Sequence, residues 1–196
     1  MDMVTTVEQQ LEESAKTKLA LKSMAGDIVS LAEAMCNCFV TGGKVLLCGN
    51  GGSAADAQHL AAELVGKLHR QRKALPAIAL TTNASVLTAV ANDNGFEEVF
   101  ARQVEALANP GDVLIGISTS GNSENVLRAM QMGNEKKALT VGWTGEKGGR
   151  LELVAQLCLR VPSNNTQRIQ ECHITIGHIV CGIVEELLQD QMGQPT

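Results

Sequence analysis

Short apolar runs alternate with longer amphipathic stretches through most of the chain. Five of these runs are nearly continuous in apolar residues, as expected for strands that are covered on both faces. Each is followed by a segment with helical spacing. The predicted strands are residues 44–49, 77–80, 112–117, 138–143 and 155–161. The sequence therefore predicts an α/β fold: a three-layer α/β/α sandwich with a five-stranded parallel sheet, flavodoxin-like with strand order 2-1-3-4-5.

Both ends of the chain are predicted to be helical. Apolar residues recur near helical spacing through 7–23 and 24–40, and Gly42-Gly43 is a stop signal after them. Residues 166–190 have the pattern of one long helix. The two N-terminal helices are therefore expected to lie outside the sheet, and the last helix to close the chain.

The length and composition are those of one globular domain. The 196 residues are 44% apolar and 19% charged, which is too apolar for a disordered chain. We therefore expect a single domain over residues 1–196, with residues 1–41 as a helical extension. The net charge of −5, the scattered Lys and Arg residues, and an aromatic content of 2% argue against a nucleic-acid partner.

No feature of the sequence indicates a membrane or an export signal. No uninterrupted apolar run approaches membrane length, and no basic region followed by an apolar core opens the chain. We expect a cytoplasmic protein without membrane association. The six cysteines lie mostly in apolar segments, as reduced core residues do. Cys36 and Cys38 could instead bind a metal, but no second close pair completes a tetrahedral site.

A glycine-rich turn follows the first predicted strand. In Asn50-Gly51-Gly52-Ser53, the glycines let the backbone approach a ligand, and Ser53 is expected to cap the next helix. Free amides at a helix start favour an anion, although an ordinary strand-to-helix turn explains the same residues. The turn lacks the spacing of a dinucleotide motif, and the loop after the third predicted strand lacks the lysine of a P-loop, so we expect no nucleotide cofactor.

The loop after the third predicted strand is rich in hydroxyl groups. Ser118, Thr119, Ser120 and Ser123 stand together within "GISTSGNSENVL". Hydroxyls and amides at a helix start suit a phosphate monoester. With strand order 2-1-3-4-5, the first and third strands are neighbours, so this loop and the glycine-rich turn should line one crevice.

Ionisable side chains follow in two helical segments. His59 and Glu63 are four residues apart and share a helix face, where they suit a general base or a divalent metal, or form a simple solvated pair. The last helix carries Gln170, Glu171, His173 and His178 in an apolar setting. Spacing does not decide which of Gln170, Glu171 and His173 accompanies His178, and its histidines could be satisfied core residues.

Five stretches together give the chain a specific resemblance. They are "CGNGGSAADAQHLAAEL", "ANDNGF", "GDVLIGISTSGNSENVL", "TGEKGG" and "RIQECHITIGHIV". The chain resembles the phosphoheptose isomerases of the SIS (sugar isomerase) domain family over essentially its whole length. The resemblance implies a homotetramer with sites formed between subunits, in which residues 1–41 take part in packing.

The resemblance also implies site residues. The metal set, usually zinc with one ion per subunit, would be His59, Glu63, Gln170 and His178, with Gln170 favoured over Glu171. Glu63 and His178 match the proposed base and acid. Phosphate would be held by Ser118, Thr119, Ser120 and Ser123, and the sugar site would be lined by Asn50, Gly51, Gly52, Ser53, Asn92 and Asp93.

The implied reaction converts sedoheptulose 7-phosphate to D-glycero-D-manno-heptose 7-phosphate through an enediol, the first step toward activated heptose for surface polysaccharides. Fold alone does not fix this chemistry. The alternatives are a noncatalytic SIS protein that binds sugar phosphates or assembles with a replication initiator, and an isomerase of a shorter ketose phosphate. Retention of His59, Glu63 and His178 argues against the noncatalytic alternative.

Overall fold

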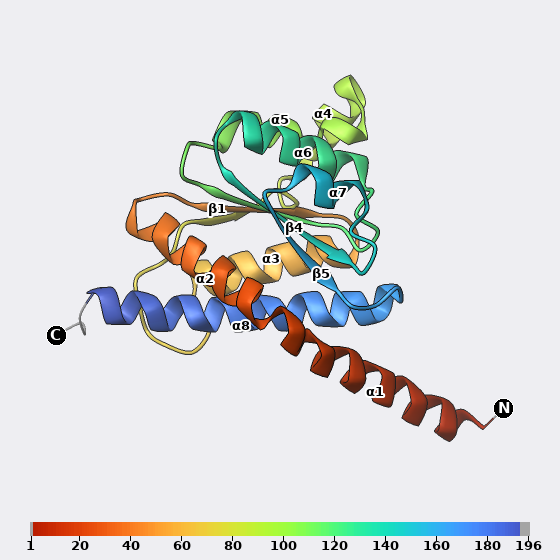
Figure 1. Ribbon diagram of the computed structural model, residues 1–196. Helices are drawn as coiled ribbons and strands as arrows, with labels where there is room; N and C mark the ends of the chain where they lie inside the picture. The colour runs from red at the N-terminus through yellow and green to blue at the C-terminus, as the bar shows by residue number, and fades with distance from the viewer. Residues whose placement is uncertain (1, 193–196) are drawn as a thin grey trace.

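The computed structural model describes residues 2–192, and its central element is one parallel sheet (Figure 1). The strands are β1 (Val45–Gly49), β2 (Ala77–Ala79), β3 (Val113–Ile117), β4 (Leu139–Gly145) and β5 (Leu157–Val161). Their order is β2-β1-β3-β4-β5, with every neighbouring pair parallel. The predicted fold class and strand order are confirmed, and each strand lies within a few residues of its expected position.

Helices cover both faces of the sheet. The α-helices are α1 (Met3–Ala20), α2 (Ala25–Val40), α3 (Gly52–Val65), α4 (Ala84–Asn94), α5 (Ala101–Leu107), α6 (Glu124–Glu135), α7 (Gly149–Val154) and α8 (Thr166–Met192). Two short 3₁₀ turns are η1 (Leu21–Met24) and η2 (Phe96–Glu98). In Figure 1, α2, α3 and α8 lie below the sheet, whereas α4 to α7 lie above it. This arrangement gives the three predicted layers.

Successive strand residues point into two separate cores. Val45 and Leu47 belong to the core between the sheet and α2, α3 and α8, while Leu46 and Cys48 belong to the core on the α5 and α6 side. Because side chains alternate across a strand, a strand with a core on each face must be apolar at every position. This is the physical reason why the strands appear in the sequence as continuous apolar runs.

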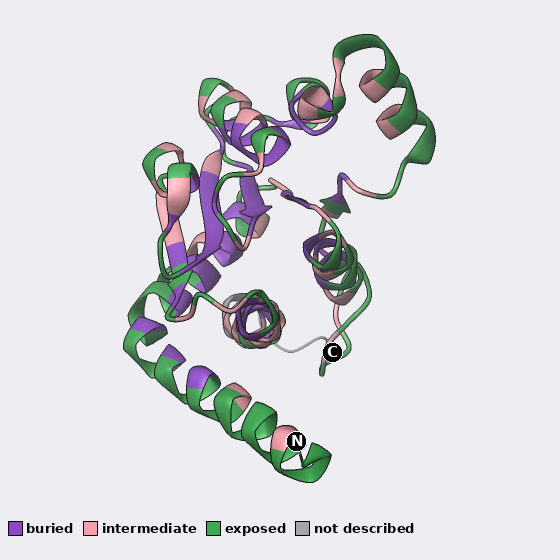
Figure 2. Ribbon diagram, turned by 90° about the vertical axis from the view of Figure 1, so that its right-hand side faces the viewer, coloured by how far each residue is buried: buried purple, intermediate pink, exposed green. Residues whose placement is uncertain are grey.

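Helix α1 extends away from the sheet, and Figure 2 shows it exposed along nearly all of its length. Thr17 is its only buried residue, whereas Val4, Val7 and Leu11 are exposed. The buried guanidinium of Arg168 on α8 holds the helix by donating to the carbonyl of Gln10 at 2.7 Å. The predicted helical N-terminus is confirmed, with the 3₁₀ turn η1 between its two helices.

All six cysteines lie within the described residues, and none is in a disulfide. Five are buried, including Cys36 and Cys38, and Cys158 is half-buried. Their burial agrees with the prediction that they are core residues. Among residues 2–192, none of the helices combines the length and the apolar character that crossing a membrane requires.

Candidate metal and ligand site

A tight contact between α3 and α8 lies beside the predicted ionisable residues. Gly177 on α8 faces the buried Leu60 on α3, and a Cβ atom at Gly177 would lie only 2.4 Å from Cδ2 of that leucine. A side chain at position 177 would therefore force Leu60 or one of the helices to shift. His59 and His178 are the chain neighbours of Leu60 and Gly177, so this contact sets how closely their imidazoles meet.

His59, Glu63 and His178 form one cluster. The Nε2 atoms of His59 and His178 lie 2.8 Å apart, and Nε2 of His59 lies 3.3 Å from Oε1 of Glu63. The ligand atoms of all three lie within 4.8 Å of one another. The Glu63 side chain is 19% exposed and that of His59 is 47% exposed, so the cluster opens to solvent on one side. Two imidazoles and a carboxylate in this arrangement can hold a metal ion.

Contacts of the last helix distinguish the three residues that spacing left open. Glu171 accepts a hydrogen bond from Ser14 of α1 at 2.6 Å and pairs with Arg168, so its carboxylate is engaged with α1. His173 is fully buried, with Nε2 3.2 Å from the carbonyl oxygen of Thr144.

Gln170 instead faces the start of α3. Its Nε2 lies 2.6 Å from the position that a Cβ of Gly52 would take. The side-chain amide of Gln170 therefore lies against the glycine-rich turn, as a residue of the crevice would.

Asp56 is a further group on this face of α3 that the sequence interpretation missed. Residues 56, 59 and 63 have helical spacing, which places Asp56 on the same side as His59 and Glu63. Its buried Oδ2 has no hydrogen-bond partner among the described residues. Burial raises the pKa of Asp56 to about 6, although His59 acts to lower it. The three-residue spacing to His59 was the signal that could have identified it.

The glycine-rich turn differs from the prediction at Ser53. Helix α3 begins at Gly52, with Gly51 as its N-cap residue at φ +56°, and no side chain caps it. Ser53 is buried inside the first turn, and its backbone N–H donates to the carbonyl of Asn50 at 3.0 Å. The predicted Ser53 cap is therefore wrong. The left-handed conformation open to Gly51 starts the helix earlier than the cap rule places it.

The two loops at the carboxyl ends of β1 and β3 are joined directly. Asn50 and Asn125 exchange two side-chain hydrogen bonds of 2.9 Å each. Asn125, in the first turn of α6, is buried. The loops are therefore adjacent, as the strand order predicts. Asn125 was not among the predicted site residues, and an asparagine in the first turn of a helix gave no local signal of this pairing.

Hydroxyl groups converge in the second loop. The Oγ of buried Ser118 lies 2.9 Å from that of Ser123 and 3.5 Å from that of Ser120. Ser123 occupies the N-cap position of α6 without making a side-chain capping bond. The carbonyl of Thr119 accepts a hydrogen bond from the backbone of Gly145 at 3.0 Å. The loop thus places three serine hydroxyls together at the start of a helix, a suitable place for an anion.

Asn92 and Asp93 are not brought to the cluster within one chain. Both are exposed near the end of α4, where Nδ2 of Asn92 donates to Oδ1 of Asp93 at 2.7 Å. Helix α4 has no buried residue and lies above the sheet in Figure 1, whereas α3 and α8 lie below it. Their expected place at the sugar stays a prediction.

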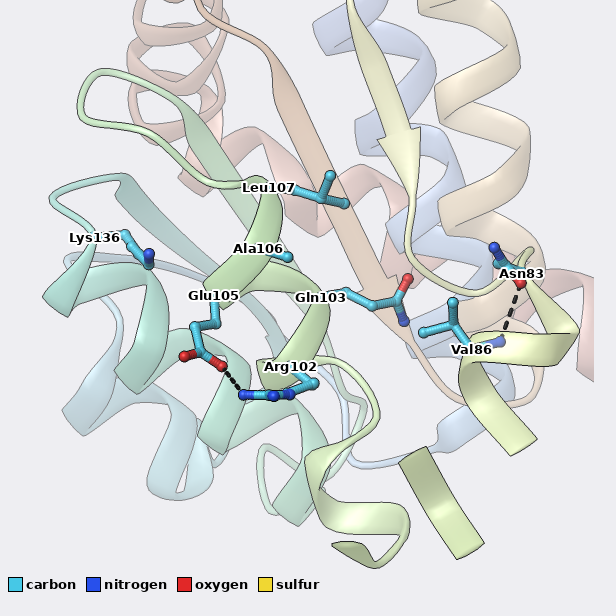
Figure 3. Close-up of a pocket in the computed structure, with 8 residues that line it drawn as sticks. All are labelled: Asn83, Val86, Arg102, Gln103, Glu105, Ala106, Leu107 and Lys136. Carbon is cyan, nitrogen blue, oxygen red and sulfur yellow. Dashed lines mark hydrogen bonds and ion pairs between the residues drawn. The ribbon is translucent and has the colours of Figure 1, made fainter. Parts of the chain in front are cut away.

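A separate hollow lies between the start of α4 and α5 (Figure 3). Its polar groups are engaged locally: Asn83 caps α4 by accepting from the N–H of Val86, and Arg102 pairs with Glu105. None of the predicted site residues lines it. We therefore place the candidate site at the α3–α8 cluster and the two loops.

The buried His173 gives the fold a pH dependence. Burial lowers its pKa to about 4, whereas the hydrogen bond to Thr144 acts to raise it, from an ordinary value of 6.5. Between these two values the unfolded chain binds more protons than the folded one, so the stability from this residue is complete above pH 6.5 and declines as the pH falls toward 4. The expected loss is on the order of 3 kcal/mol.

Urea unfolding of the wild type and His173→Gln between pH 4 and 7 measures this effect. Gln lacks an imidazole, so the free energy of unfolding of the variant should change less steeply with pH. Equal slopes for the two proteins would show that another group causes the dependence.

The fold and the site together define a class: a doubly wound α/β domain with two joined loops at the carboxyl ends of its central strands, where folds of this kind bind ligands. Residues 11–145 match the family model of the SIS domain. The phosphoheptose isomerase of Aquifex aeolicus (strain VF5) is 54% identical over 187 residues, which cover 95% of this chain and 98% of that protein.

Two solved structures show the same similarity in three dimensions. The phosphoheptose isomerase GmhA from Neisseria gonorrhoeae superposes with a TM-score of 0.89 at 42% identity, covering 94% of this chain and all of that one. A phosphoheptose isomerase from Francisella tularensis has a TM-score of 0.92 at 39% identity, covering 95% of this chain and 100% of the other. The chain belongs to the SIS domain family and, within it, to the phosphoheptose isomerases, and it is an isomerase.

Proposed function

We propose that the protein converts sedoheptulose 7-phosphate to D-glycero-D-manno-heptose 7-phosphate, as the first step toward ADP- or GDP-activated heptose. The observation that carries the proposal is the meeting of Glu63 from α3 and His178 from α8 around the imidazole of His59. Moving a proton between C1 and C2 through an enediol needs a base above the carbons and an acid near the oxygens. The cluster supplies one group of each kind from opposite helices.

In this proposal Glu63 is the base that removes the proton from carbon, and His178 is the acid that donates a proton to the sugar oxygens. The phosphate is held by the hydroxyls of Ser118, Thr119, Ser120 and Ser123, while Asn50, Gly51, Gly52, Ser53 and Gln170 line the sugar. The joined loops support this assignment, because the Asn50–Asn125 pair holds the glycine-rich turn next to the segment that carries the hydroxyl cluster. Holding both ends of the sugar fixes the reacting carbons relative to the base.

A zinc ion, one per subunit, is proposed at the cluster. The donor chemistry fits, because two imidazoles and a carboxylate within 4.8 Å of one another are typical zinc ligands. His59, Glu63 and His178 would hold the ion, with Gln170 as the fourth ligand. A bound zinc ion supplies a Lewis acid for the sugar oxygens or a fixed link between the two helices.

We further propose a cytoplasmic homotetramer with sites shared between subunits. The exposed residues Val4, Val7 and Leu11 recur at helical spacing and form an apolar stripe on α1, which supports packing of the 1–41 segment on another copy. Asn92 and Asp93 would line the sugar, as the family resemblance implies.

The test is incubation of the purified protein with a panel of ketose phosphates of five to seven carbons, with and without a chelator, followed by NMR. Conversion of the seven-carbon substrate alone supports the proposal. Conversion only of a shorter ketose phosphate would replace the substrate, and binding without conversion would favour a noncatalytic sugar-phosphate protein. Loss of turnover in chelator would support the metal.

Replacing Ser120 by Ala is expected to raise KM for the phosphorylated sugar about tenfold, with little change in kcat. One charge-assisted hydrogen bond to the phosphate would be lost, and such bonds contribute about 1.5–3 kcal/mol. Steady-state kinetics measure the effect. Ser30→Ala, at an exposed position on α2, is the control. An unaltered KM in Ser120→Ala would mean that the phosphate binds elsewhere.

A further inference from the structure

The segment that follows α3 is anchored to α8 by one buried carboxylate. Glu185 is 3% exposed, and its two oxygens accept hydrogen bonds from the backbone N–H groups of Leu68, His69 and Arg70 at 2.9, 3.0 and 3.1 Å. Burial by itself raises the pKa of Glu185, but these bonds and the guanidinium of Arg72 hold it below its ordinary value. The carboxylate is therefore ionised and fully engaged at neutral pH.

Arg72 connects this carboxylate to the end of α3. Its Nε donates to Oε1 of Glu185 at 3.0 Å, and its Nη1 donates to the carbonyl of Leu64 at 2.8 Å. Its Nη2 donates to the carbonyl of Glu63, also at 2.8 Å. Helix α3 has no basic residue in its last turn, so Arg72 provides the positive charge that the exposed carbonyls of a helix end favour.

Arg72 and Glu185 are each linked to one residue of the proposed catalytic pair, Glu63 and His178. Arg72 bonds the backbone of Glu63 itself, and Glu185 stands seven residues after His178, two turns along the same face of α8. Cys181 lies between them: burial chiefly raises the pKa of its thiol to about 12, and the charges of Glu63, Arg72 and Glu185 all act on it. The three charged groups are therefore gathered around one point of α8.

We propose that Arg72 and Glu185 are positioning residues that fix the last turn of α3 against α8, and so fix the Glu63 carboxylate relative to His178. The inference rests on the proposed roles of Glu63 and His178. A rigid shell around catalytic groups and metal ligands typically contributes 10–100-fold to activity or metal affinity. Neither residue touches the substrate in this proposal.

Glu185→Gln and Arg72→Lys test the inference on the full-length protein. Gln cannot accept the hydrogen bonds of the two N–H groups at its amide nitrogen, and Lys keeps the charge but cannot bond Glu185 and the helix carbonyls together. Each variant is expected to lower kcat about tenfold with KM within twofold, and to weaken Zn²⁺ binding about tenfold in calorimetric titration. Circular dichroism establishes that the assays use folded protein.

Asp112→Asn is the matched control. Asp112 is also buried, at 1% exposure, and its carboxylate pairs with Lys44 and accepts backbone N–H groups at the start of β1 and before β3, away from the cluster. The control should lose comparable thermal stability while keeping kcat and Zn²⁺ affinity. If Glu185→Gln and Arg72→Lys behave like Asp112→Asn, the two residues are only structural and the inference is wrong.

These experiments distinguish failure of the positioning role from failure of the proposed function. An inactive Glu63→Gln together with fully active Glu185→Gln and Arg72→Lys overturns the positioning role alone. An active Glu63→Gln overturns the proposed base, and the Zn²⁺ titrations of Glu185→Gln and Arg72→Lys then still decide whether the pair positions the cluster.

Discussion

Glu63→Gln is expected to reduce isomerisation by about 10²–10⁴-fold, the usual contribution of general acid–base catalysis, while binding of the sugar phosphate is largely retained. The amide has the shape of the carboxylate but cannot take a proton from carbon. NMR of the substrate conversion measures turnover, and calorimetry with the sugar phosphate measures binding. The position of Glu63 within ligand distance of two imidazoles makes this the most informative single substitution.

Metal content has to be measured for the same variant, because Glu63 is proposed both as a ligand and as the base. A protein that keeps its zinc and its substrate affinity but not its turnover assigns the base to Glu63. If the variant loses zinc as well, the result shows that the Glu63 carboxylate is needed to bind the metal. Glu186→Gln, an exposed carboxylate on α8, is the control and should behave like the wild type. Unchanged turnover in Glu63→Gln would remove the residue from the mechanism.

The sheet could be predicted because its signal is local. Every strand position is buried in β1 and β3, so apolar runs such as Val45–Gly49 stand out against the amphipathic helices that follow them. The pairing of His59 with Glu63 is local too, since both lie on one helix. Their meeting with His178 is not local, but follows once α3 and the closing helix are placed on the same face of the sheet.

The choice among Gln170, Glu171 and His173 could not be made from spacing because contacts distant in sequence decide it. Glu171 is taken up by Ser14, 157 residues away, and His173 by a carbonyl of β4. The sequence of the last helix alone does not predict these partners. The resemblance to a family supplied the choice of Gln170 as a ligand, which stays a prediction, and the structure places its side-chain amide against Gly52 at the start of α3.

The start of α3 is a second feature that the sequence did not predict correctly. Cap preferences favour Ser over Gly, and they misplaced the helix start because Gly51 adopts a left-handed conformation that the rule does not weigh. The position of Asn92 and Asp93 is a third feature that the sequence alone could not establish. Their side chains pair with each other on α4, outside the cluster of His59, Glu63 and His178, so their expected place at the sugar stays a prediction.

Gly177→Ala is expected to lower turnover about a hundredfold, the effect of displacing catalytic groups by about 1 Å. The added methyl group would meet the side chain of Leu60 at 2.4 Å, and the buried leucine has little room to move. Leu60 must then shift or α3 and α8 must separate, and either movement disturbs the contact beside His59 and His178. Overpacking of this kind costs about 1–3 kcal/mol, partly offset by the roughly 1 kcal/mol gained when Ala replaces Gly in a helix.

Gly26→Ala separates the clash from the helix propensity. Gly26 also lies within a helix, and a Cβ there would meet nothing within 4 Å in the described chain. It should therefore raise the melting temperature slightly and leave turnover and Zn²⁺ affinity unchanged. The double variant Leu60→Ala, Gly177→Ala removes the clashing atoms, so it should recover part of the turnover that Gly177→Ala loses. Wild-type turnover in Gly177→Ala would show that the spacing of the two imidazoles is set elsewhere in the α3–α8 contact.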